Sequence, residues 1–117
     1  MTFKEYAEKY KEASRFCALV NTGNSTDITD ENTRSIYVDT ENFISDSRKL
    51  SDIHPKLLNS IPEKVHLLTA DEFSALFFGG ECYDGLEKNE KILIVLFSKK
   101  ILDENKEFEA EPFRPFH

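Results

Sequence analysis

The run from Lys91 to Phe97 constrains the fold of this chain more than any other stretch. Six apolar residues, Ile-Leu-Ile-Val-Leu-Phe, follow Lys91 without interruption, and Ser98-Lys99-Lys100 closes the run. A continuous apolar run of this length, bounded by polar residues, is typical of a strand that is buried on both faces. The sequence therefore predicts a sheet in which this strand is central.

Shorter segments predict the rest of the sheet and its helices. The expected strands are Arg15–Val20, Arg34–Asp39 and Glu63–Leu68, and the expected helices include Thr2–Ser14, Lys56–Ile61 and Ala70–Phe78. Thr2 with Glu5 fits a capping box, and Thr69 is an N-cap candidate for the last helix. We expect the first two strands to pair antiparallel. The order of strand, helix and strand from Val65 to Phe97 predicts a right-handed crossover between parallel strands.

The expected fold class is therefore α+β, or α/β, with one four-stranded mixed sheet packed against three to four helices. The chain has 117 residues, so residues 1–117 are expected to form a single small domain. Its two cysteines are too few for a disulfide scaffold, and Cys17, in an apolar run, is expected to be buried. The first residues lack an apolar stretch of signal-peptide length, which predicts a cytoplasmic protein with reduced thiols.

The charge of the chain limits its partners. Fifteen basic residues against twenty-two acidic ones give a net charge of −7. This balance argues against nucleic acid or an anionic membrane as a partner. Residues 21–47 hold six acids and one base, Arg34; the acids are Asp27, Asp30, Glu31, Asp39, Glu41 and Asp46. These acids either keep the protein soluble or form a negative face that meets a basic partner.

The segment 103–117 is a second acidic region, and it also carries three phenylalanines. Phe108, Phe113 and Phe116 are too apolar to lie together in water. The segment therefore either packs on the body of the domain or docks on a partner. Pro112 and Pro115 disfavour a helix or a central strand here.

Asp39 stands at the carboxyl end of a predicted strand, within Ile36-Tyr-Val-Asp-Thr-Glu-Asn-Phe43. A hydrophobic strand that ends in Asp, followed three residues later by Asn, resembles the first motif of PIN/NYN-type nuclease domains. That resemblance implies a divalent metal held by Asp39 and by acids after later strands, for which Asp71 is a candidate. Lys99 and Lys100 stand where another acid would be expected. The alternative is that Asp39 caps the following helix.

Other candidate sites are weaker in the sequence. Cys82 lies in a turn-rich loop between Glu81 and Asp84, whose charges raise the pKa of a thiol and favour an inert cysteine. The three histidines, His54, His66 and His117, lack the close spacing of zinc ligands. The sequence therefore predicts neither a metal site nor a cofactor, apart from the Asp39 alternative.

These observations favour a small acidic protein-binding module that inhibits or neutralises a protein with a basic surface, as immunity proteins and phage-encoded antagonists of host defence do. Its oligomeric state is left open. The alternative is a small metal-dependent hydrolase or nuclease centred on Asp39. The residues expected to bind the partner come from the acidic region and the tail: Asp27, Asp30, Glu31, Asp39, Glu41, Phe113 and Phe116.

Overall fold

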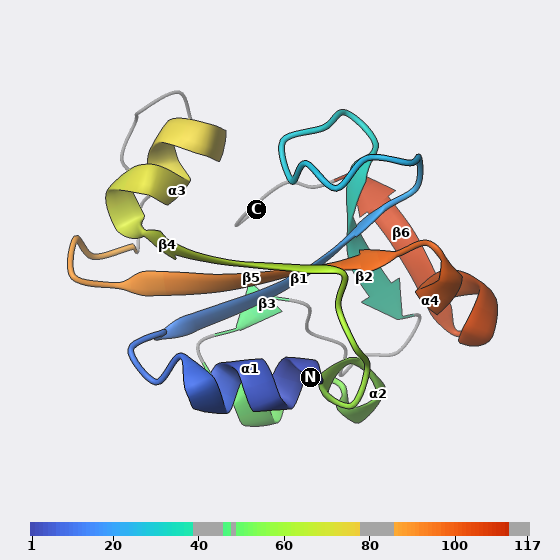
Figure 1. Ribbon diagram of the computed structural model, residues 1–117, viewed down its shortest axis with the longest axis horizontal. Coiled ribbons are helices and arrows are strands. Elements are labelled where there is room, and N and C mark those ends of the chain that lie inside the picture. The colour runs from blue at the N-terminus through green and yellow to red at the C-terminus, as the bar shows by residue number, and fades with distance from the viewer. Residues whose placement is uncertain (39–45, 48, 78–85, 113–117) are drawn as a thin grey trace.

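In a computed structural model, the apolar run forms β5 (Lys91–Ser98), which lies inside a mixed sheet (Figure 1). The structure describes residues 1–38, 46–47, 49–77 and 86–112. The six residues from Ile92 to Phe97 are all buried, and only the two ends of the strand are partly exposed. The predicted central strand is confirmed, because β5 has a neighbouring strand on each side.

The other strands among the described residues are β1 (Arg15–Asn21), β2 (Thr33–Val38), β3 (Asp46–Ser47), β4 (Lys64–Thr69) and β6 (Phe108–Pro112). Five of the described strands follow one another across the sheet in the order β4–β5–β1–β2–β6. β1 runs parallel to β5, whereas the pairs β1–β2, β2–β6 and β4–β5 are antiparallel. The two-residue β3 also pairs with β1, opposite Phe16 and Cys17.

Within the described ranges, this small α+β domain also has four helices and one 3-10 turn: α1 (Phe3–Lys9), the turn η1 (Leu50–Asp52), α2 (Pro55–Leu58), α3 (Ala70–Phe77) and α4 (Lys100–Glu104). The capping box predicted for α1 is present, with the Glu5 amide donating to Thr2 Oγ1 at 3.2 Å and the Thr2 amide donating to Glu5 Oε1 at 2.9 Å. α1 is shorter than predicted, since the Ser14 amide donates to the Lys91 carbonyl and so joins the sheet.

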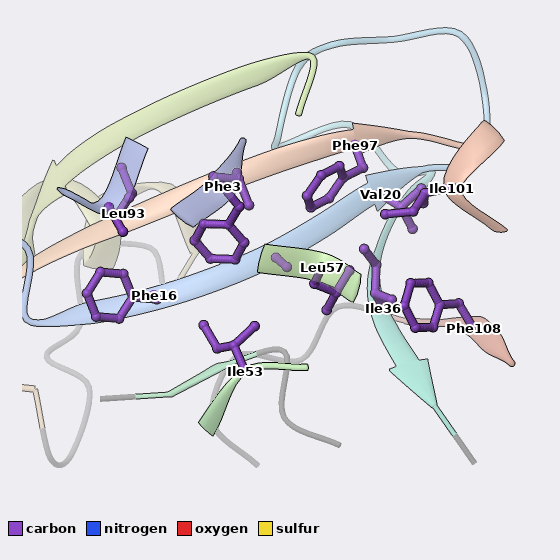
Figure 2. Close-up of a cluster of buried hydrophobic side chains, with 13 residues drawn as sticks. Phe3, Phe16, Val20, Ile36, Ile53, Leu57, Leu93, Phe97, Ile101 and Phe108 are labelled. Atoms are coloured by element: carbon purple, nitrogen blue, oxygen red, sulfur yellow. The ribbon is translucent and has the colours of Figure 1, made fainter. Parts of the chain in front are cut away.

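The two faces of the sheet carry separate hydrophobic clusters. Alternate residues of β5 point to opposite faces, with Leu93, Val95 and Phe97 in the first cluster and Ile92, Ile94 and Leu96 in the second. α1 and α2 cover the first face, and Figure 2 shows Phe3 and Leu57 packed over the sheet there. α3 and the loop 22–32 lie over the second face (Figure 1).

The predicted parallel crossover from β4 to β5 is wrong. The two strands are antiparallel, with Thr69 opposite Lys91 and Lys64 opposite Leu96. α3 begins directly at the carboxyl end of β4, and β5 begins at that same end, with Lys91 paired to Thr69. The Ala70 amide donates to the Glu90 carbonyl, so the chain re-enters the sheet at the same end of β4 at which it left the sheet.

The sheet also has more strands than the four predicted, because the acidic tail contributes β6. Phe108 is 4% exposed and belongs to the first cluster, so this part of the tail packs on the body of the domain. Pro112 is compatible with β6 because it ends an edge strand, where a missing amide is tolerated. Phe113 and Phe116 lie outside the described residues.

Candidate functional site

The loop 22–32 is held on the second face of the sheet by one apolar side chain. Ile28 is 5% exposed and packs in the cluster that includes Leu19 and Ile94. Around this anchor, Asp27 and Asp30 each bond to the backbone two residues further on, to the amides of Thr29 and Asn32 at 2.9 Å. These are the local bonds that Asp favours in turns. The loop is therefore ordered by its own carboxylates.

The three predicted partner-binding acids of this loop differ in their exposure and in their hydrogen bonds. Asp27 and Glu31 are exposed, whereas Asp30 is half-buried and also accepts a bond from Asn21 Nδ2 at 3.1 Å. Hydrogen bonds from the hydroxyl and the amide of Thr29 lower the pKa of the Asp27 carboxyl. Burial opposes this effect, and the charges of Lys64 and His66 lower the pKa by smaller amounts. Asp27 therefore stays charged at neutral pH.

Two acids of β6 lie on the same face of the sheet as this loop. Glu111 stands opposite Ser35 in β2, and Ser35 stands opposite Leu19 in β1, whose side chain belongs to the second cluster. Residues directly opposite one another in a sheet share a face. Glu109, two residues before Glu111, shares it too, and both glutamates are exposed.

Arg34, the base among these acids, occupies a position of the other face. It stands opposite Val20, which is a member of the first cluster. Its Nη1 donates to the carbonyls of Glu31 and Thr33. We call the resulting surface the acidic face, and its described members are Asp27, Asp30, Glu31, Glu109 and Glu111.

The sequence placed Glu109 and Glu111 in an acidic tail and did not join them to the loop. The alternation Phe108-Glu109-Ala110-Glu111 is a strand pattern and could have predicted β6. Its pairing with β2 could not have been predicted, because that contact is long-range. Four of the predicted partner-binding residues, Asp39, Glu41, Phe113 and Phe116, lie outside the described residues, as does Cys82.

His66 is a residue of β4 on the second face, opposite Ile94 of β5. Its Nε2 atom is buried and has no hydrogen-bond partner among the described residues. Burial lowers the pKa of His66, the charge of Lys64 lowers it further, and Asp27 opposes both effects. His66 is therefore neutral at physiological pH, whereas Lys64, two residues away on the same face of β4, carries a positive charge.

The metal-dependent alternative needs Asp39 and Asp71 to approach one another. The strand ends that precede them, Val38 of β2 and Thr69 of β4, are separated by β1 and β5. Three interstrand spacings amount to about 14 Å, whereas a shared metal needs carboxylate oxygens within about 2 Å of the ion. In the described ranges, no group of three or more His, Cys, Asp or Glu side chains is placed to hold a metal. Asp39 itself is outside those ranges, so the alternative stays a prediction.

Comparisons with known protein families, with curated proteins and with solved structures give no match to the chain. No helix in the described ranges is long and apolar enough to cross a membrane.

Proposed function

We propose that this protein is a small acidic protein-binding module that inhibits or neutralises a partner with a basic surface. The observation that carries the proposal is the acidic face, on which a loop and an edge strand from distant parts of the sequence place five carboxylates: Asp27, Asp30, Glu31, Glu109 and Glu111. Two bases lie beside these acids: Lys64 stands opposite Leu96 and so shares the face, and Arg34, at a position of the opposite face, donates from Nη1 to the Glu31 carbonyl.

The rigidity of this face supports the proposal. The loop is fixed by Ile28 and by the bonds of Asp27 and Asp30, and β6 is fixed by its pairing with β2 and by the buried ring of Phe108. Carboxylates held in place need little ordering when a partner binds. Their summed field speeds encounter with a basic surface, and the bound module then excludes anionic ligands from that surface.

The test compares two double charge reversals that change the net charge equally. Glu109→Lys with Glu111→Lys alters the acidic face, whereas Glu8→Lys with Glu12→Lys alters exposed positions in and just after α1, which covers the opposite face. Wild type and both variants are used to capture partners from extract of the native host at low and at high salt. Circular dichroism checks that each variant is folded.

We expect wild type and the α1-side variant to capture the same basic protein at low salt and to release it as salt rises. The acidic-face variant should bind that protein at least tenfold more weakly, mainly through a slower association rate. Equal capture by all three proteins, or capture that does not change with salt, would contradict the proposal.

A further inference from the structure

We propose that a pocket at the carboxyl ends of β1 and β5 binds a small phosphate-bearing anion. This pocket has a volume of about 270 Å³ and is lined by residues 23–26, Asn21, Glu63, Ser98, Lys99 and Lys100. It is distinct from the acidic face, because none of the five carboxylates of that face lines it. The inference does not depend on the proposed function.

The topology of the sheet creates the pocket. β1 and β5 are adjacent and parallel, with Asn21 opposite Ser98 at their carboxyl ends. The chain then leaves β1 into the loop 22–32 and leaves β5 directly into α4, and these segments diverge in Figure 1. A hollow beyond the carboxyl ends of parallel strands, where the following segments separate, is the usual place for a ligand in sheets with helices on both faces.

The charges at the pocket favour an anion. Lys99 and Lys100 both line it, and neither has an acidic group within ion-pair distance among the described residues. Two lysines next to one another that lack acidic partners offer a phosphate two charge-assisted contacts. The hydroxyls of Ser25, Thr26 and Ser98 are available for the remaining oxygens of the anion.

The loop side of the pocket is already organised for binding. Asn21 is 4% exposed; its Oδ1 accepts from the Gly23 amide at 2.7 Å and its Nδ2 donates to Asp30 Oδ1. A Cβ atom at Gly23 would lie 3.0 Å from Asn32 Nδ2 and 3.2 Å from Asn21 Oδ1, so the loop closes this tightly because the residue is glycine. Because the loop is already ordered, it loses less conformational entropy when a ligand binds.

A change at Glu63 tests whether the pocket binds anions. Glu63 lines the same hollow, and its backbone amide donates to the Leu96 carbonyl at 2.8 Å. The Glu63→Gln change removes a negative charge and leaves that backbone bond intact. If the pocket binds anions, this variant binds them more tightly than wild type, a gain that partial unfolding cannot produce.

The experiment is a titration of the isotope-labelled protein with inorganic phosphate at constant ionic strength, followed by amide NMR shifts. We expect saturable shifts at residues 23–26 and 98–100. Lys99→Gln with Lys100→Gln should weaken apparent binding about tenfold. The control, Lys11→Gln with Lys88→Gln, changes two exposed lysines near the opposite ends of β1 and β5 and should leave binding unchanged.

Glu63→Gln should tighten phosphate binding severalfold. The proposal is overturned if the shifts do not saturate, if chloride at equal ionic strength reproduces them, or if both lysine pairs weaken binding equally. It is also overturned if Glu63→Gln binds phosphate no better than wild type.

Discussion

Replacing Phe108 by alanine tests whether the acidic tail is part of the domain core. The Phe108 ring is 4% exposed and packs in the first cluster, with the His54 ring edge-on at a centroid distance of 5.7 Å. This ring, the side chain of Ala110, contacts with α4 and the pairing with β2 hold β6 in place. We expect the Phe108→Ala variant to lose a large part of its stability.

The magnitude follows from the burial of the ring. A phenylalanine buries about 150–250 Å² on folding, and each Å² of apolar surface contributes about 25 cal/mol. The side chain thus contributes about 4 kcal/mol, and replacement of a buried phenylalanine by alanine typically costs about 3–5 kcal/mol once the cavity is included. Small domains have a free energy of unfolding of about 5–15 kcal/mol. The variant should therefore lose about a third of its stability or more.

Urea unfolding followed by circular dichroism measures this loss. Glu109→Ala is the matched control, since Glu109 is the next residue in β6 and is exposed; its change should stay within about 0.5 kcal/mol. If Phe108→Ala does not fold, Phe108→Leu keeps much of the apolar volume and should cost about 1 kcal/mol. A loss below about 1 kcal/mol for Phe108→Ala would refute the assignment of this ring to the core.

Two further predictions concern buried charge. Arg15 Nε and Glu90 Oε1 lie 3.3 Å apart, with side chains 8% and 13% exposed, so Glu90→Gln should destabilise the protein by about 3 kcal/mol in urea unfolding; Glu87→Gln, at an exposed position, should not. In the folded protein the pKa of His66 lies below its ordinary value of 6.5. As the pH drops, the unfolded chain therefore binds a proton at His66 at a higher pH than the folded protein does, and the free energy of unfolding should fall as the pH drops through 6.5. An NMR titration of His66 should show the lowered pKa, and a stability slope unchanged in His66→Gln would contradict its role.

Much of the local structure could be predicted from the sequence because short-range chemistry determines it. The apolar run makes β5 a buried strand, and Thr69 with Glu72 begins α3 through reciprocal bonds of 3.1 Å. The antiparallel pairing of β1 with β2 was expected and is observed. Asp27 and Asp30 were recognisable as loop acids, since aspartates bond to their own backbone in turns.

The sequence by itself thus determined, to within a residue, where α1, α2, α3, β1, β2, β4 and β5 begin, which of their residues are apolar enough to be buried, and that the loop after β1 is acidic. Only the tertiary structure decided that β4 runs antiparallel to β5, that β6 joins β2, and that the pocket forms beyond β1 and β5. The physical reason is that these features depend on contacts between residues far apart in the chain. The free energy of such contacts comes from packing across the whole sheet, and no short segment encodes it.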